Sequence, residues 1–175
     1  MKPARPVRRR AGTARRRVEP RSAQPRVTRS VTLHATCVLI DGVGILLRGR
    51  PGSGKSDLAL RVIEAGGRLV ADDQVVVRRR AGRLTASPPP TLAGRIEVRG
   101  VGIVAVAHEG QAPIGLVVDL VAPEAVARLP EPETCKILGQ ALPRLRLAPF
   151  AASAVAKLRI AARERRADSM PADDS

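Results

Sequence analysis

A glycine-rich segment followed by a lysine and a serine has the spacing of a phosphate-binding loop. It fits the pattern G-x-x-x-x-G-K-[ST] and consists of Gly49, Arg50, Pro51, Gly52, Ser53, Gly54, Lys55 and Ser56. In such loops backbone N–H groups surround anionic oxygens, the lysine reaches the β- and γ-phosphates, and the hydroxyl binds Mg²⁺. The segment therefore predicts a nucleotide site, with Lys55 as phosphate ligand and Ser56 as metal ligand.

Two adjacent carboxylates downstream supply further candidate chemistry. Asp72 and Asp73 directly follow the apolar residues 69–71. In P-loop proteins a strand-end acid holds Mg²⁺ or its water. Regular strand geometry would point the two side chains to opposite faces, whereas a turn would let both approach one site. One would then suit metal binding and the other would take a proton from an acceptor hydroxyl. A solvated Asp-Asp turn is the alternative.

The residues around the glycine-rich segment supply the strand and the helix that a phosphate-binding loop needs. The apolar residues 43–47 precede it, and Leu58, Val62 and Ala65 recur after it at helical spacing, before a glycine pair. A chance glycine-rich turn is the other interpretation. The flanking elements favour phosphate binding, because a motif of this kind is confirmed by its context.

Most of the remaining predicted elements are short strands. Residues 36–40 and 44–47 predict a β-hairpin around Asp41-Gly42. Other strands are expected at residues 68–71, 74–77, 95–99, 102–106 and 114–120, and a helix at residues 153–166. Tight turns between strands argue against a purely parallel doubly wound sheet. The predicted fold class is α/β or α+β, with a mixed, strand-rich sheet, a P-loop helix and a C-terminal helix.

The formal charge of +15 is concentrated at the N-terminus. Residues 1–30 hold one Lys and ten Arg against Glu19, or +10, which leaves +5 for residues 31–175. We predict that this arginine-rich tail is disordered. Nucleic-acid binding, membrane contact, organelle import and solvated filler are the possible roles, and we favour filler over nucleic-acid binding.

Membrane insertion and disulfide chemistry are not indicated. No apolar stretch approaches the ~18 residues that would span a bilayer. Cys37 and Cys135 are far apart and form no C-x-x-C pair, so neither a disulfide framework nor a zinc site is expected. A soluble protein in a reducing cytoplasm fits these observations.

The order and spacing of four features resemble the catalytic domain of HPr kinase/phosphorylase. They are His34, the P-loop continuing into Asp57, the Asp72-Asp73 pair, and the stretch Glu-Val-Arg-Gly-Val-Gly-Ile at residues 97–103. The last motif combined with the acidic pair is specific to this family. The resemblance covers about residues 31–160 and is closest to the short form without an extra N-terminal domain. We expect a catalytic domain at residues 31–162 and a disordered tail at 163–175.

This resemblance implies a cytoplasmic, hexameric protein-serine kinase. It would use ATP and Mg²⁺ to phosphorylate HPr, a small carrier protein of the sugar phosphotransferase system. Its fold would be similar to the nucleotide domain of phosphoenolpyruvate carboxykinase. The resemblance assigns phosphate binding to Lys55, Mg²⁺ binding to Ser56 and Glu97, the general base to Asp73, a metal-side place to Asp72, and active-site roles to His34 and Arg128.

Two departures from the family affect the expected activity. The longer members also remove phosphate from phosphoserine, a reaction linked to a loop like Val-Arg-Pro-Gly-Arg-Asn. Here residues 147–154 read Leu-Ala-Pro-Phe-Ala-Ala-Ser-Ala, which puts phosphorylase activity in doubt. With almost no aromatic residues, the chain is also expected to select nucleotides loosely, so that pyrophosphate could serve as well. The alternatives are a non-catalytic nucleotide sensor with a nucleic-acid-binding tail and a small-molecule P-loop kinase.

Overall fold

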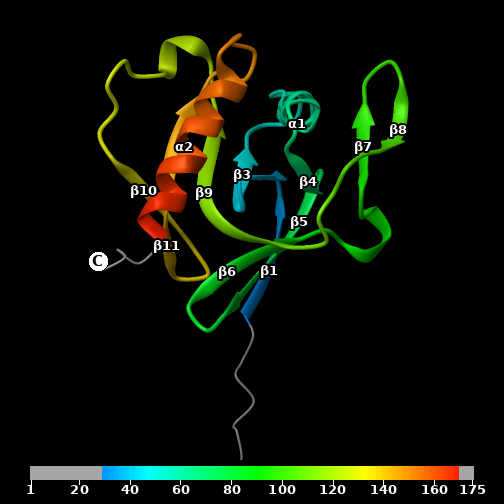
Figure 1. Ribbon diagram of the computed structural model, residues 1–175, viewed down its shortest axis with the longest axis horizontal. Helices are drawn as coiled ribbons and strands as arrows, with labels where there is room; N and C mark the ends of the chain where they lie inside the picture. Colours follow the sequence, from blue (N-terminus) through cyan, green and yellow to red (C-terminus); the bar gives the residue numbers. More distant parts are fainter. Residues whose placement is uncertain (1–28, 170–175) are drawn as a thin grey trace, which may run out of the picture.

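The computed structural model describes residues 29–169, which fold into a curved sheet with two α-helices (Figure 1). The elements in chain order are β1 (Arg29–His34), β2 (Thr36–Ile40), β3 (Val43–Arg48), α1 (Lys55–Glu64), β4 (Arg68–Ala71), β5 (Gln74–Arg80), β6 (Arg83–Ser87), η1 (Pro90–Leu92), β7 (Arg95–Val98), β8 (Gly102–Ala105), β9 (Ala112–Leu120), η2 (Pro123–Ala125), β10 (Glu133–Ile137), β11 (Gln140–Leu147) and α2 (Ala154–Ser169).

The main sheet is mixed, as the sequence predicts. Its order is β1-β5-β6-β9-β3-β2-β4, with β11 also pairing β9 and β10 pairing β11. Strand β9 runs parallel to β3 and to β11, whereas β2 is antiparallel to both β3 and β4. Strands β4, β3, β9 and β11 therefore run in one direction and end at the same edge of the sheet. The β7–β8 hairpin forms a separate two-stranded sheet.

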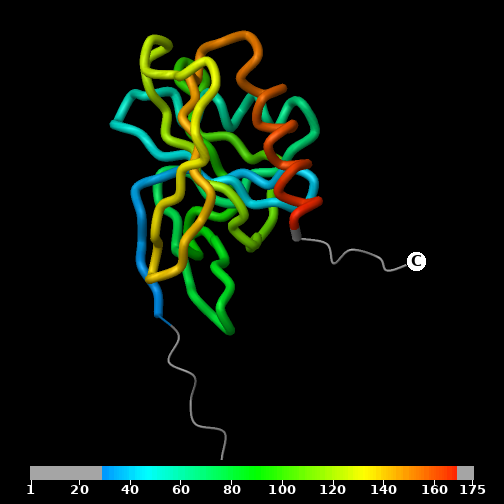
Figure 2. The backbone as a smooth tube through the Cα atoms, turned by 90° about the vertical axis from the view of Figure 1, so that its left-hand side faces the viewer, coloured from blue at the N-terminus to red at the C-terminus, as the bar shows by residue number. Residues whose placement is uncertain are grey.

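Two apolar cores lie on opposite faces of the central strands. Ile45 and Leu47 of β3 pack in the core with Leu58 of α1 and Leu158 of α2, whereas Leu46 packs in the other core with residues of β1, β5 and β6. This alternation follows the two-residue period of a strand. Both helices lie on one side of the central strands (Figure 2). The P-loop helix is thus fixed against the strand that precedes it.

The predicted hairpin and the predicted helix after the glycine-rich segment are confirmed. Strands β2 and β3 pair antiparallel around Asp41 and Gly42, whose φ angles of 50° and 83° suit the tight turn of a two-residue hairpin. Helix α1 begins at Lys55 and ends at Glu64. The five other predicted strands appear as β4, β5, β7, β8 and β9; β4 has the predicted bounds, and the others differ by one to three residues at one end.

Other parts of the fold differ from our expectations. Strands β1, β6, β10 and β11 were not predicted. Strand β1 starts inside the basic segment, β6 runs into the proline-rich residues 88–90, and β11 contains Pro143. Arg29 and Ser30, which we expected in a disordered tail, pair with β5. Helix α2 continues to Ser169, so residues 163–169 are helical rather than a tail. The remainder of both predicted tails lies outside the described residues.

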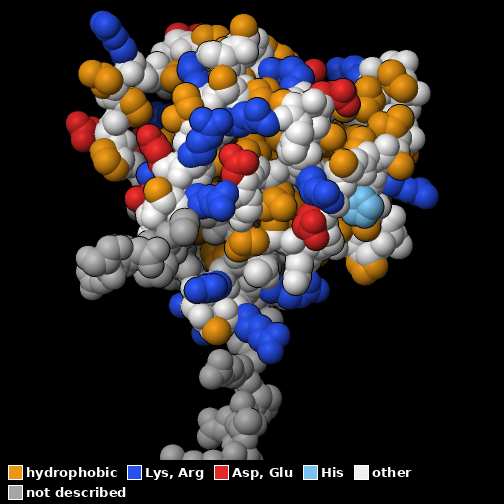
Figure 3. Space-filling view, viewed as in Figure 1, with side chains coloured by type: hydrophobic (Ala, Val, Ile, Leu, Met, Phe, Trp, Pro, Cys, Tyr) orange, Lys and Arg blue, Asp and Glu red, His pale blue; other side chains and the backbone are white. Residues whose placement is uncertain are grey.

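Charge is mixed over the surface that Figure 3 shows, and hydrophobic side chains gather over the β7–β8 hairpin at its right. Val101 and Ile103 of this hairpin are both 73% exposed. Between residues 29 and 169, no helix is long and apolar enough to cross a membrane.

The two cysteines lie in different places and are both free. Cys37 is buried on β2, and this burial raises the pKa of its thiol to about 12. A thiol with so high a pKa is protonated at neutral pH and unreactive as a nucleophile.

An ion-pair network joins the ends of the parallel strands. The guanidinium of Arg48 donates to both oxygens of Asp119, at 2.7 and 3.0 Å, and Arg144 Nε donates to Asp119 at 2.6 Å. Desolvation opposes ionisation of Asp119, but hydrogen bonds from Arg48 and Arg144, together with their charges, outweigh it and lower the pKa of this carboxyl. The network ties β3, which leads into the P-loop, to β9 and β11.

We predict that Asp119→Asn lowers the free energy of unfolding at pH 7 by about 2 kcal/mol, because Asn cannot satisfy two guanidinium groups. The folded-state pKa of Asp119 is depressed, so its stabilising effect is complete above the unfolded value of about 3.9 and is lost as the pH falls through the folded value. Urea unfolding at pH 7 and at lower pH measures both effects.

The control is Asp168→Asn, which removes an exposed ion pair with Arg165 and should change stability by less than about 0.5 kcal/mol. A stability difference between wild type and Asp119→Asn that stays constant from pH 7 down to pH 3 would contradict the assignment.

Candidate functional site

The glycine-rich segment forms a tight loop between β3 and α1. Gly52 and Gly54 have φ angles of 77° and 89°, a region that favours glycine. Ser53 N–H donates to the carbonyl of Arg50 at 3.1 Å, which closes the turn. Gly54 caps α1, so the first N–H groups of the helix face the loop. Together, the turn and the helix N-terminus have the architecture of an anion site.

Lys55 is held inside this loop. Its side chain is buried with 7% exposure, and Nζ donates to the carbonyls of Gly49 and Arg50 at 3.0 and 3.1 Å. The ammonium group therefore lies across the loop and not in solvent. A phosphate in the loop would meet this charge directly, which fits the predicted role of Lys55.

Asp72 is buried and accepts hydrogen bonds from two hydroxyls. Thr36 Oγ1 donates to Oδ1 at 2.8 Å, and Ser56 Oγ donates to Oδ1 and Oδ2 at 2.9 and 3.1 Å. Thr36 is fully buried on β2, next to β4 in the sheet. The carboxylate is thereby fixed against the serine of the P-loop, on the side where a phosphate-bound metal would lie.

Asp73 differs from Asp72 in backbone conformation and in exposure. Its φ angle of 64° breaks the strand, and its side chain is 65% exposed. His34 Nδ1, at the end of β1, lies 3.1 Å from Asp73 Oδ1. The turn that we considered at the strand end is therefore present. It leaves Asp72 behind Ser56 and brings Asp73 to the open side.

One cavity of about 440 Å³ brings most of the predicted residues together. Its lining includes His34, Lys55, Ser56, Asp73 and Glu97, and also Pro51, Gly52, Gly54, Asp57, Leu60, Val98, Arg99 and Phe150. The β7–β8 hairpin contributes Glu97 and packs against α1 through Ile96 and Val98. Arg50 and Ser53 line a neighbouring cavity instead.

The oxygen ligands suit Mg²⁺ bound together with a nucleotide. Mg²⁺ is usually held by one or two carboxylates, waters and substrate phosphates. Ser56 and Asp72 form such a partial ligand set at the P-loop. In residues 29–169, no group of three or more His, Cys, Asp and Glu is arranged to hold a metal. The predicted metal ligation by Glu97 stays a prediction.

Arg128 is not brought to this cavity. It is exposed in the segment between η2 and β10 and does not line the cavity. Its predicted catalytic role stays a prediction that this arrangement of the chain does not support. Sequence reasoning overlooked Thr36 and Phe150. A threonine within an apolar strand and the sole aromatic residue of the chain are the signals that could have identified them.

Comparisons with known proteins agree with the geometry. A family model described as "HPr Serine kinase C-terminal domain" matches residues 25–169. The chain is 46% identical over 72 residues to the HPr kinase/phosphorylase of Clostridium botulinum (strain Eklund 17B / Type B), covering 41% of this chain and 24% of that protein. It is 41% identical over 80 residues to the enzyme of the same name from Brevibacillus brevis, covering 45% and 26%. The alignments thus span about a quarter of these curated relatives.

A solved structure is also similar. The Hpr(Ser) kinase/phosphatase from Coxiella burnetii superposes with a TM-score of 0.71 at 28% identity, over 79% of this chain and 92% of that one. This chain therefore shares its mixed, strand-rich sheet with two helices with that structure.

Removing the hydroxyl of Thr36 tests how Asp72 is held. We predict that Thr36→Val lowers the free energy of unfolding by about 1–2 kcal/mol, because a buried carboxylate loses one of its donors. Thr32→Val, the same change at an exposed position on β1, is the control and should have little effect. Chemical denaturation measures both. Equal stability of the two variants would show that the Thr36 bond contributes nothing.

Proposed function

Because this chain belongs to the HPr Serine kinase C-terminal domain family, we propose that it transfers the γ-phosphoryl group of ATP to a serine hydroxyl of an HPr-type carrier protein. The observation that carries the proposal is the divergence of two adjacent carboxylates. Asp72 is buried against the P-loop serine, and Asp73 is exposed beside His34 in the same site region. One acid thus serves the phosphate donor and the other serves the acceptor.

On the donor side, the P-loop and α1 bind the phosphates. The N–H groups of the loop and Lys55 Nζ offer hydrogen bonds and positive charge to the β- and γ-phosphates. Ser56 and Asp72 would hold Mg²⁺, which neutralises phosphate charge when it is bound. Thr36 keeps Asp72 in its orientation and so acts as a positioning residue.

On the acceptor side, Asp73 is the general base. A hydrogen bond from His34 Nδ1 would occupy Oδ1 and leave Oδ2 free to accept the serine proton. As the proton moves to Asp73, a bond forms between the serine oxygen and the γ-phosphorus. The bond from that phosphorus to the β–γ bridging oxygen breaks, and ADP leaves. Phosphoryl transfer requires positioning and charge neutralisation more than covalent help, which these residues supply.

The openness of the site favours a protein acceptor over a small molecule. His34 and Asp73 are 51% and 65% exposed, and Glu97 on the β7–β8 hairpin is also exposed. A serine on the surface of another protein could reach the base from outside. A small-molecule kinase would need an enclosing lid, and none of the described elements closes over Asp73.

Family membership also supports a wider proposal about the whole protein. We include in it a cytoplasmic location, hexameric assembly and a role in regulating the sugar phosphotransferase system. Nucleic-acid binding is not part of it, because residues 31–175 carry a formal charge of only +5. Sedimentation velocity with the full chain measures the assembly.

We predict that the protein, incubated with Mg-ATP and its cognate HPr-type carrier, forms phosphoserine. Asp73→Asn should lower this rate by at least about 10²-fold, because the base is lost, while ATP remains bound. Mass spectrometry of the carrier and calorimetric titration with ATP give the two measurements. Asp41→Asn is a matched control, since Asp41 is also an exposed Asp with positive φ but lies in the β2–β3 turn.

Two results would refute this assignment. Absence of phosphoserine on every HPr-type carrier tested, at all metal concentrations, would refute the kinase activity. Undiminished turnover by Asp73→Asn would assign the base elsewhere.

The segment between β11 and α2 generates a further prediction. Pro149 and Phe150 lie beside the P-loop, and residues 147–154 contain no Arg, Gly or Asn. We therefore expect that phospho-carrier and inorganic phosphate release no pyrophosphate above the background set by the Asp73→Asn variant. A coupled pyrophosphate assay checks this. Pyrophosphate release at a rate similar to the kinase reaction would show that the substituted loop still supports phosphorolysis.

A further inference from the structure

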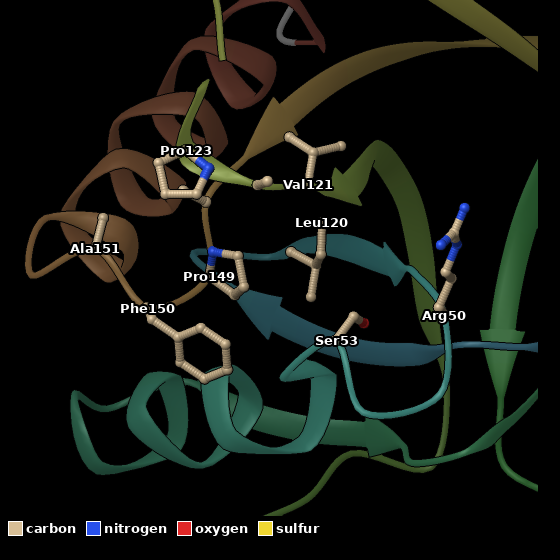
Figure 4. A pocket seen from close by; sticks show the side chains of 10 residues that line it. Arg50, Ser53, Leu120, Val121, Pro123, Pro149, Phe150 and Ala151 are labelled. Carbon is tan, nitrogen blue, oxygen red and sulfur yellow. The ribbon is translucent and has the colours of Figure 1, made fainter. Parts of the chain in front are cut away.

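A second cavity lies on the opposite side of the P-loop from the acidic pair. It measures about 650 Å³, and its lining is mostly apolar (Figure 4). We call it the apolar pocket and define it by Arg50, Ser53, Leu120, Pro123, Pro149 and Phe150. Its volume lies within the range of small-molecule sites. Two P-loop residues form part of its wall and Phe150 also lines the phosphate cavity, so the two cavities are adjacent.

The strand order determines which part of a nucleotide would reach this pocket. The acidic pair follows β4, the P-loop follows β3, and the pocket is built from the segments that follow β9 and β11. The order across the sheet is β4, β2, β3, β9, β11. A triphosphate on the P-loop with its γ-phosphate toward Asp73 therefore extends its other end toward β9 and β11. In open α/β sheets, ligands bind beyond the carboxyl ends of the strands in this way.

We propose that the apolar pocket binds the nucleoside of ATP and that Phe150 is the residue on which the base stacks. This inference rests on the proposed function, because it needs the phosphates to lie on the P-loop. It gives Phe150 a role within residues 147–154, where the chain lacks the Arg, Gly and Asn of the family's loop.

The placement of Phe150 supports this role. It is the only aromatic residue of the chain and is 70% exposed. Its ring lies against the P-loop, since a Cβ added to Gly54 would lie 2.7 Å from the ring Cζ. It borders both the apolar pocket and the phosphate cavity. A base stacked there would cover an aromatic face that is otherwise in water.

The segment that carries Phe150 is attached to the P-loop helix. Arg61 of α1 donates to Asp57 of the first helical turn and also to the carbonyl of Pro149. The backbone that carries the ring is therefore anchored to the helix of the phosphate site. Such preorganisation lowers the entropic cost of binding.

One polar group in the pocket wall lacks a partner. Ser53 Oγ is inaccessible to solvent and makes no hydrogen bond with the described part of the chain. In the observed rotamer this oxygen lies against Gly49. Rotation of the side chain toward the pocket would let a ribose hydroxyl or a base nitrogen satisfy it.

The test compares a nucleotide with an anion that lacks the nucleoside. Wild type and Phe150→Ala are titrated calorimetrically with Mg-ATP and with magnesium tripolyphosphate. We expect Phe150→Ala to weaken ATP binding by about tenfold, the effect of losing one stacked base, and to leave tripolyphosphate binding unchanged. Phe150→Tyr keeps the ring and should restore ATP affinity. Leu129→Ala, which removes another exposed apolar side chain that does not line the pocket, is the control.

The outcomes separate this inference from the proposed function. Equal ATP affinity of wild type and Phe150→Ala would overturn it, as would a parallel loss of tripolyphosphate affinity, which would assign Phe150 to the shape of the loop. Wild type that binds neither ligand would remove the P-loop premise and the inference with it. The expected selective loss of ATP affinity supports the pocket even if no carrier protein is phosphorylated.

Discussion

Strand β3 pairs in parallel with β9. Strand β2 lies between β3 and β4 and is antiparallel to both, so β4 runs in the same direction as β3. The P-loop, the acidic pair and the segments after β9 and β11 consequently emerge at one edge of the sheet. Helix α1 packs on the core formed by these strands, and the Arg48–Asp119–Arg144 network ties three of them together. If this parallel arrangement were lost, the donor and acceptor groups would no longer face one region.

The turn after β4 places two chemically identical side chains in different surroundings. Asp72 is desolvated and fixed by two hydroxyls, and Asp73 is placed by a left-handed backbone where solvent and a partner protein can reach it. In the proposed mechanism, the different roles of the two acids thus follow from the backbone conformation at Asp73 and not from residue type. The turn leads into β5, and β1 pairs along β5. This pairing brings His34, at the end of β1, to the turn.

Local pattern was sufficient to predict the elements around the P-loop. The β2–β3 hairpin, α1 and the acidic turn each depend on neighbouring residues, such as Gly54 or Asp41-Gly42. By contrast, β1 depends on pairing with β5 and β11 on pairing with β9, and their basic or proline-containing sequences conceal this. Strand β10 pairs with β11 in a local hairpin that the sequence pattern did not indicate. Thr36 and Phe150 take part through contacts across 36 and 96 residues of sequence, which no local pattern could indicate. For Arg128, resemblance alone suggested a catalytic role, and that role stays a prediction.

The two carbonyl bonds of Lys55 have a consequence for how the loop binds an anion. They hold the buried ammonium group at a fixed place in the loop. An ammonium group has three N–H donors, so one remains for an oxygen of the anion. The lysine is therefore oriented before a phosphate arrives, and its side chain loses little further freedom when the phosphate binds.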